Sequence, residues 1–405
     1  MNLPNAALSD LRIVEGSAFV AAPLGGLTLA QLGADVIRFD HLSGGLDFHR
    51  WPVTNENQSL FWIGLNRGKS SIQVDLKSSK GREIVSDLIT APGKDAGIFL
   101  TNLPAKDELS YEALKKKRPD LIMVSLTGNY DGTSEVDYTV HPAFGYPLIT
   151  GPLGSNAPVN SVLPTWDLIL GNMVAIAILV AERKRRATGE GEFIKIALSD
   201  VALSVVGALG RLSQAHLGTE KIQADGNFLY GAFGANFTTR DNFEVMIVGL
   251  TPRQWVSIKN SLDIQDGLKE IEEKHDGNLD LEADRYRLRR EISEVIRPAI
   301  SAIDLKDLSE IFKKFNVSWS KYQTFTELLA NDPRASEANP IFSVKDQEDI
   351  GELPNISSPI RFANTHNLEA QSAHKFGADT DEVLKRILQL DQGEIQALRD
   401  SKLIN

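Results

Sequence analysis

The first two hundred residues alternate short apolar runs with helical segments, and this alternation restricts the possible folds more than any other feature. Strands are predicted at 11–14, 35–39, 71–75, 97–100, 121–126 and 194–198, and helices at 23–32, 80–89, 111–117 and from about 167. Parallel strands need crossover connections, which are usually helices, so this pattern is typical of a parallel sheet. We therefore expect an α/β fold for the N-terminal half.

A second region begins near residue 225. Strands are predicted at 228–233 and 243–248, and a charged helix at 281–300. After residue 332 the chain is rich in loops and ends in short helices. These changes predict segments at 1–224, 225–331 and 332–405, which fits two or three domains in 405 residues.

Composition excludes several classes of function. The net charge of −11 argues against general attraction to nucleic acid or anionic membranes, so a polyanionic ligand requires a local basic patch. An arginine run at 285–290 fits either a nucleic-acid surface or a solvated helix face, and its interleaved acidic residues favour the second. The chain has no cysteine, and its seven histidines show no metal-ligand spacing, so we expect no protein-bound metal.

We also predict a cytoplasmic protein that makes no contact with membranes. The first residues lack the basic and apolar segments of a signal peptide. The longest apolar run, 173–181, is much shorter than the roughly 20 residues that span a bilayer, and is interpreted as part of a buried helix.

Common nucleotide and hydrolase motifs are missing from the sequence. The first strand–helix turn, 15–23, lacks the Gly-x-Gly-x-x-Gly spacing that brings a pyrophosphate against a helix. The sequence has no phosphate-binding Gly-x-x-x-x-Gly-Lys-Ser/Thr loop and no Gly-x-Ser-x-Gly elbow. Dinucleotide-dependent, nucleoside-triphosphatase and serine-hydrolase functions are therefore disfavoured.

Asp167 stands where an apolar helix is expected to begin, within the stretch 164–174. A carboxylate there meets unpaired backbone N–H groups and the positive end of the helix dipole, so we expect it to be ionised and directed outward. Two interpretations fit. Asp167 is a plain helix cap, or it is a carboxylate nucleophile.

Three blocks decide between them, because together they resemble the class III CoA-transferases. The blocks are 22–40, 66–77 and 183–198. The C-terminal stretch 380–384 also resembles the corresponding stretch of this family. Asp167 lies where that family carries its catalytic aspartate. The resemblance implies a large Rossmann-like domain built from the N-terminal half and the returning C-terminal tail, a smaller α+β domain between them, and an interlaced homodimer.

Four other stretches, 14–23, 46–54, 132–147 and 226–234, resemble a narrower group of the family, which moves CoA between the two carboxyl groups of one C4-branched dicarboxylate. The resemblance implies that Asp167 attacks the thioester of a dicarboxylate acyl-CoA. CoA is then part of the substrate and no separate cofactor is expected. An intermolecular dicarboxylate CoA-transferase and a non-catalytic CoA-binding protein are the alternatives.

The resemblance also implies residues that hold CoA. Lys77 and Lys106 match positions that contact CoA, and Val74 and Leu198 match apolar contacts to it. His41 stands where some relatives have an arginine against the adenine, so it is either a stacked imidazole or an ordinary surface histidine.

Further charged residues have two interpretations each. Arg38 and Lys69 are candidates for phosphate binding or ordinary charges at strand ends. Asp137 matches an acidic residue beside the family's nucleophile, and otherwise it caps a loop. Related racemases carry a histidine directly before this acid, but here Val136 takes that place. This argues against racemisation, which needs a base on each face of the α-carbon.

An intramolecular transfer requires the released acid to be retained and turned within the site. We therefore expect a closed pocket with a cation or several hydrogen-bond donors for the second carboxylate. The candidates are Arg50, Asn227 and Tyr230, and a surface or turn position explains each of them equally well.

Overall fold

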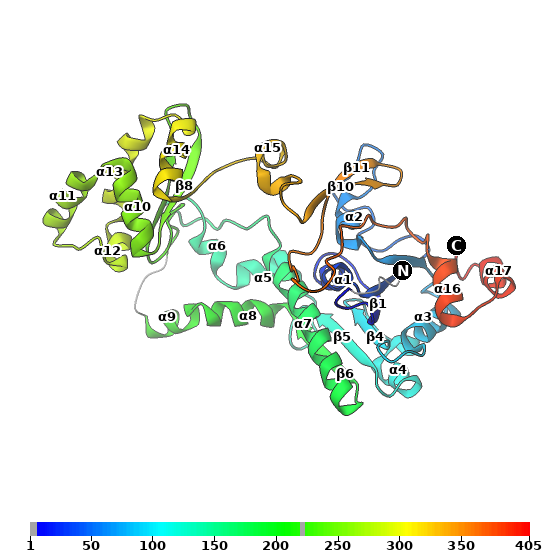
Figure 1. Cartoon of the computed structure of the whole chain (residues 1–405). Helices are drawn as coiled ribbons and strands as arrows, with labels where there is room; N and C mark the ends of the chain where they lie inside the picture. Colours follow the sequence, from blue (N-terminus) through cyan, green and yellow to red (C-terminus); the bar gives the residue numbers. More distant parts are fainter. Residues whose placement is uncertain (1–5, 219–222) are drawn as a thin grey trace. The chain divides into compact units, whose positions relative to one another are not determined.

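The computed structural model describes residues 6–218 and 223–405, and by its internal contacts the chain divides into two compact units (Figure 1). The parallel-sheet unit comprises the described residues of 1–144, 161–219 and 333–405, and the antiparallel-sheet unit those of 145–160 and 220–332. Segment 145–160, expected in the first domain, belongs to the second unit. The Gly226 N–H donates to the Gly151 carbonyl at 3.0 Å, and the Gly154 N–H donates to the Ala224 carbonyl at 2.9 Å.

A six-stranded, fully parallel sheet forms the centre of the first unit. Its order is β3-β2-β1-β4-β5-β6, with β1 (Arg12–Gly16), β2 (Asp35–Asp40), β3 (Ser70–Gln73), β4 (Ile98–Thr101), β5 (Ile122–Thr127) and β6 (Glu192–Ala197). The predicted α/β fold is therefore confirmed. The strand order reverses between β1 and β4, and open parallel sheets bind ligands beyond the carboxyl ends of the strands at such a switch point.

Helices and a hairpin complete this unit. They are α1 (Ala21–Gln31), α2 (Leu60–Asn66), α3 (Ser79–Thr90), η1 (Asp107–Leu109), α4 (Tyr111–Lys117), α5 (Asp137–Ala143), α7 (Thr165–Thr188), α8 (Leu198–Ala208), α9 (Arg211–Leu217), η2 (Pro333–Ala335), the antiparallel pair β10 (Phe342–Gln347) and β11 (Gly351–Ile356), α16 (Thr380–Leu388) and α17 (Gln392–Asp400).

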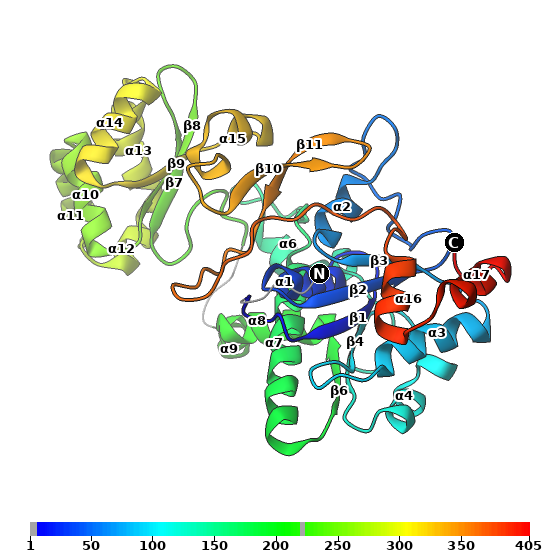
Figure 2. The same cartoon turned by 45° about the vertical axis from the view of Figure 1, so that its right-hand side comes forward.

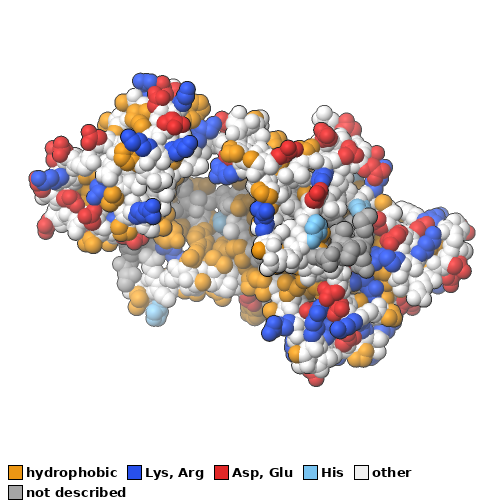
Figure 3. Space-filling model, viewed as in Figure 1, with side chains coloured by type: hydrophobic (Ala, Val, Ile, Leu, Met, Phe, Trp, Pro, Cys, Tyr) orange, Lys and Arg blue, Asp and Glu red, His pale blue; other side chains and the backbone are white. Residues whose placement is uncertain are grey.

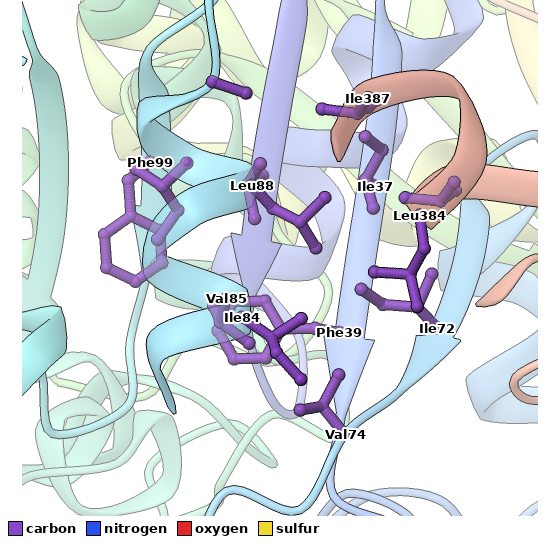
Figure 4. Packing of buried hydrophobic residues seen from close by; sticks show 14 of the residues in the cluster. Ile37, Phe39, Ile72, Val74, Ile84, Val85, Leu88, Phe99, Leu384 and Ile387 are labelled. Atoms are coloured by element: carbon purple, nitrogen blue, oxygen red, sulfur yellow. The ribbon is translucent and has the colours of Figure 1, made fainter. Parts of the chain in front are cut away.

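The C-terminal segment returns to the sheet and contributes to its core. Helix α16 packs against β3 and α3 (Figure 2). Its Leu384 and Ile387 point toward Ile37 of β2 and Ile72 of the edge strand β3 (Figure 4). This cluster is built from alternate strand residues, as the period of two in a strand requires.

Helices α1 and α7 pack closely through glycines. A Cβ at Gly25 would lie 2.6 Å from the Val174 side chain, and one at Gly171 would lie 2.9 Å from the Ala21 carbonyl oxygen. By length and composition α7 is apolar enough to cross a membrane, with a mean hydropathy of 1.6 over its most apolar 18 residues. Its buried residues, Leu170 and Ile178 among them, instead make it a core helix of this unit.

The antiparallel-sheet unit is a three-stranded sheet with helices. The strands, in the order β7-β8-β9, are β7 (Phe233–Thr238), β8 (Glu244–Gly249) and β9 (Ser318–Lys321). The helices are α6 (Tyr146–Ile149), α10 (Pro252–Leu262), α11 (Gln265–His275), α12 (Glu282–Arg287), α13 (Arg289–Ser301), α14 (Leu305–Phe315) and α15 (Phe325–Asn331).

Two predictions for this unit need correction. The strand predicted at 228–233 is a turn up to residue 232, because Gly226 and Gly231 adopt φ values of +62° and +76°. The helix predicted at 281–300 is divided at Leu288. Within the arginine run, Arg285 is buried and donates to backbone carbonyls. On the face drawn in Figure 3, basic and acidic side chains interleave, as a solvated surface requires.

Candidate active site

Asp167 is the third residue of α7. Residues four apart lie on one face of a helix, so Asp167 shares its face with Gly171. Gly171 in turn abuts the Ala21 carbonyl at the start of α1, the helix that follows β1. Asp167 therefore lies on the face of α7 that packs against α1, the helix that follows the β1–α1 turn, and an α/β sheet of this order binds ligands beside that turn.

Asp137, the first residue of α5, caps α7 from a separate segment. Its side chain is 3% exposed, and its Oδ2 accepts the backbone N–H groups of Trp166 at 2.7 Å and Asp167 at 3.0 Å. These are two of the amides that a helix leaves without an internal partner. Because Asp137 satisfies them, the Asp167 carboxylate is not required as their cap.

The surroundings of Asp167 correct the expectation that it is fully ionised. Burial, followed by the negative charge of Asp137, raises its pKa from 3.8 to about 7, while the positive charge of Arg50 acts in the opposite direction. Near pH 7 about half of the molecules then carry a charged Asp167. Desolvation and a like charge outweigh the helix dipole here.

Besides Asp137, Arg50 is a sequence-predicted residue whose charge acts on Asp167, because it lowers the pKa of that carboxyl group. Its guanidinium carbon lies 5.2 Å from the ring centroid of Phe61 and 5.6 Å from that of Phe19. Both distances are within the range of cation–π attraction. Arg50 is exposed, so its charge is available to a ligand carboxylate beside Asp167.

Asn102 at the switch point was not predicted from the sequence. This residue directly follows β4, and its side chain accepts the Ala18 N–H at 2.9 Å and donates to the Ala18 carbonyl at 2.8 Å. It thereby joins the loops after β1 and β4. Its position after a strand at the reversal of strand order was the signal that could have identified it.

Arg38 and Lys69 lie in a buried ion network, which contradicts their predicted role in phosphate binding. Arg38 is 0% exposed and pairs with Asp40 at 2.8 Å and Asp47 at 3.1 Å. Lys69 is 1% exposed and pairs with Glu15 at 2.8 Å. Burial lowers the pKa of Lys69 to about 8, and Glu15 acts in the opposite direction. Both cations are used to neutralise buried carboxylates.

The sequence of this chain is similar to those of known CoA-transferases. The sequence model for CoA-transferase family III matches residues 8–380. The chain belongs to this family. It is 47% identical over 398 residues to 2-methylfumaryl-CoA isomerase of Chloroflexus aurantiacus, covering 98% of this chain and 97% of the relative.

Two further similarities are more distant. Succinate–glutarate CoA-transferase of Agrobacterium fabrum is 34% identical over 212 residues, which is 49% of this chain and 52% of the relative. The crystal structure of a CAIB/BAIF family protein from Brucella suis superimposes with a TM-score of 0.77 at 23% identity, over 94% of this chain and 99% of that one. This last likeness supports the fold.

The residues predicted to hold CoA divide into two groups. His41, Lys77 and Lys106 follow β2, β3 and β4, so they belong to the carboxyl edge of the sheet. Lys77 and Lys106 are exposed. The His41 Nδ1 accepts the Leu76 N–H at 3.3 Å, which ties the imidazole to the loop after β3.

The other group is apolar and has no free side-chain surface. Val74 is 0% exposed within the core of the sheet, and Leu198 is 4% exposed at the start of α8. The predicted apolar contacts of these side chains with CoA are therefore not compatible with their burial. A contact between CoA and Val74 or Leu198 would have to use the backbone atoms of these residues.

Asn227 and Tyr230 belong to the antiparallel-sheet unit, in the turn before β7. Asn227 lines a pocket of about 560 Å³ within that unit, together with Asn236 and Arg297. Asp225 at the same pocket pairs with Arg289 at 2.7 Å, so that carboxylate is already neutralised. Tyr230 is 63% exposed.

Proposed function

We propose that this chain is an intramolecular CoA transferase, which moves CoA from the C1 to the C4 carboxyl group of mesaconate (2-methylfumarate) by covalent catalysis on Asp167. The 47% identity to 2-methylfumaryl-CoA isomerase, over nearly the whole of both chains, carries this proposal. The position of Asp167 supplies the chemistry, because a carboxylate can open a thioester and keep the acyl group activated.

The first half of the proposed reaction releases the acid. The ionised Asp167 carboxylate attacks the C1 thioester carbonyl, the C–S bond breaks, and CoA thiolate leaves a mixed anhydride. The thiolate then attacks the aspartyl carbonyl, which gives an aspartyl–CoA thioester and free mesaconate.

The second half repeats these steps at the other end of the acid. The C4 carboxylate of mesaconate attacks the aspartyl–CoA thioester and forms a second anhydride, and CoA thiolate is again released. The thiolate attacks the C4 carbonyl, which frees the Asp167 carboxylate and completes the isomer. Each intermediate is about as activated as a thioester, so catalysis depends mainly on positioning and on stabilising the oxyanions.

The described residues support defined roles in this sequence. Asp137 holds the first turn of α7 and thereby the backbone of Asp167. Arg50 is the cation proposed to meet the second carboxylate. Lys77, Lys106 and His41 are proposed for CoA, whose phosphates an acidic protein must meet with placed cations. The role of Asn227 and Tyr230 in retaining the free acid stays a prediction from the sequence.

A second copy of the chain is the proposed partner. Met173, Ile176 and Val180 form an exposed stripe on α7 at helical spacing, with Ile176 and Val180 each 61% exposed. Exposed leucines continue along α8 and α9: Leu203, Leu209, Leu212 and Leu217. Extended apolar surface of this kind marks protein interfaces. We propose an interlaced homodimer, and elution as a folded monomer in light-scattering chromatography would contradict it. A cytoplasmic location stays a prediction.

The function is tested by incubating the purified enzyme with mesaconyl-C1-CoA and no added acid. Chromatography is expected to show the C4 isomer, and the Asp167→Ala enzyme is expected to form none. If the C4 isomer appears only after an external carboxylate is added, the transfer is intermolecular and the proposal fails. If Asp167→Ala binds and converts the thioester as the wild type does, the covalent route fails.

A further inference from the structure

The turn between β1 and α1 is held from three sides by polar contacts. The Arg38 guanidinium donates to the Ser17 carbonyl at 3.0 Å, and the Asn102 side chain binds both backbone groups of Ala18. The Asp47 Oδ2 accepts the Phe19 N–H at 2.9 Å. Because the Arg38 and Asp47 side chains are 1% and 0% exposed, water does not compete for these contacts.

Phe19 has a backbone conformation that is rare for a residue with a side chain. Its φ is +65°, in the left-handed region that favours glycine. Such a conformation costs roughly 1 kcal/mol and persists only where the surroundings enforce it. The hydrogen bond from Phe19 to Asp47 is one of the contacts that enforce it, two residues before α1 begins.

The strained residue and Asp47 together hold Arg50. The Phe19 ring lies 5.6 Å from the guanidinium carbon, with Phe61 as a second support. The Arg50 backbone N–H donates to the Asp47 carbonyl at 3.0 Å. Asp47 therefore binds the backbone of both Phe19 and Arg50. Among the salt bridges of the described residues none involves Arg50, so its charge is not consumed by another protein carboxylate.

We propose that Asp47 and Phe19 are positioning residues, which hold the charge of Arg50 near the Asp167 carboxyl group and so set the strength of the nucleophile. This inference rests on the proposed role of Asp167. Without the Phe19 ring, an exposed arginine samples many rotamers and its average attraction for Asp167 falls.

The sign of the effect follows from the charges around Asp167. Asp137 on α5 raises its pKa and Arg50 lowers it. His141, also on α5, lies with its ring 5.9 Å from that of Trp166, and behind the turn Arg38 is paired with Asp47. Loosening Arg50 removes the attractive charge and leaves Asp137 in place. The pKa of Asp167 then rises further, and less of the nucleophile is ionised at neutral pH.

The test uses Phe19→Gly, because glycine adopts a φ of +65° without strain and the lost ring is 38% exposed. The acidic limb of the kcat/KM–pH profile is expected to move up by about 0.5 to 1 pH unit, a roughly two- to fivefold loss at pH 7 that is recovered near pH 9. Asn57→Gly is the matched control. Asn57 is an exposed residue with a φ of +61°, and its replacement is expected to leave the profile unchanged.

Arg50→Met and the double variant complete a thermodynamic cycle. Because both changes act through one charge, the double variant is expected to shift the limb no further than Arg50→Met alone. An unshifted limb in Phe19→Gly beside a shifted limb in Arg50→Met would overturn the proposal, as would fully additive shifts.

A second measurement does not depend on turnover. Carbodiimide reacts with protonated carboxyl groups, and mass spectrometry of the peptide that contains Asp167 gives its labelling at each pH. In Phe19→Gly the labelling is expected to persist to higher pH than in the wild type, and identical labelling curves would refute the positioning role. If the wild type fails to isomerise mesaconyl-C1-CoA, the proposed function fails while this curve still decides the role of Phe19.

Discussion

Replacing Asp167 with asparagine is expected to stabilise the protein while abolishing its activity, and the gain should depend on pH. Asparagine has the shape of the protonated acid but never carries its charge. In the folded chain the pKa of Asp167 is raised from 3.8 to about 7, first by burial and then by Asp137. That rise corresponds to about 4 kcal/mol of free energy that opposes ionisation in the folded state.

The pH range follows from the sign of this change. A carboxyl group whose pKa is raised on folding favours the folded state below pH 4, and this advantage is lost as the pH rises through about 7. Asp167→Asn should therefore match the wild type below pH 4. It should exceed the wild type by up to about 4 kcal/mol in unfolding free energy above pH 8.

Urea unfolding of both proteins at closely spaced pH values measures this difference. The matched control is Asp131→Asn, because Asp131 is an exposed acid whose pKa is lowered by hydrogen bonds to Thr133. Its replacement should give no gain at high pH. A stability difference between Asp167→Asn and wild type that stays constant across the pH range would refute the account of Asp167 as a desolvated carboxylate.

Two further predictions concern the neighbours of Asp167 and the cations. Asp137→Asn keeps an acceptor for the Trp166 and Asp167 amides but removes a negative charge, so the acidic limb of the kcat/KM–pH profile should move down by about one pH unit. An unmoved limb would show that Asp137 does not act on Asp167 through its charge. Lys69→Met should lower the unfolding free energy by about 3–5 kcal/mol, because Glu15 is left buried without its cation. Lys77→Met, at an exposed lysine, should leave stability within about 0.5 kcal/mol and raise the KM for the thioester. A large loss of unfolding free energy in Lys77→Met, or an unchanged unfolding free energy in Lys69→Met, would contradict the structural role of Lys69 and the binding role of Lys77.

Much of the fold was predictable because it rests on local patterns. The strand that contains Ile37 and Phe39 has a strong apolar run, and Gly189, directly after α7, indicated the end of that helix. The turn at 228–232 was not predictable as a turn, because its residues have high strand propensity, which Gly226 before it and Gly231 within it override. Segment 145–160 joins the second unit through backbone contacts that no local pattern encodes.

The site was predictable only where a motif marked it. Asp167 and Asp137 followed from resemblance, and the structure adds that one caps the helix of the other. The pKa of Asp167 was not predictable, because burial by distant segments decides it. Arg38 and Lys69 were candidates for phosphate binding or ordinary strand-end charges, and the sequence did not show that Lys69 has a buried partner, Glu15.

The covalent role of Asp167 is the central claim, and trapping the intermediate tests it most directly. The enzyme is mixed with mesaconyl-C1-CoA and quenched with borohydride, which reduces an aspartyl–CoA thioester to the homoserine side chain, and the peptide that contains residue 167 is sequenced by mass spectrometry. The account predicts homoserine at position 167 in substrate-treated enzyme and unchanged aspartate in enzyme treated without substrate. Unmodified Asp167 in enzyme that turns over fully under the same conditions would contradict it.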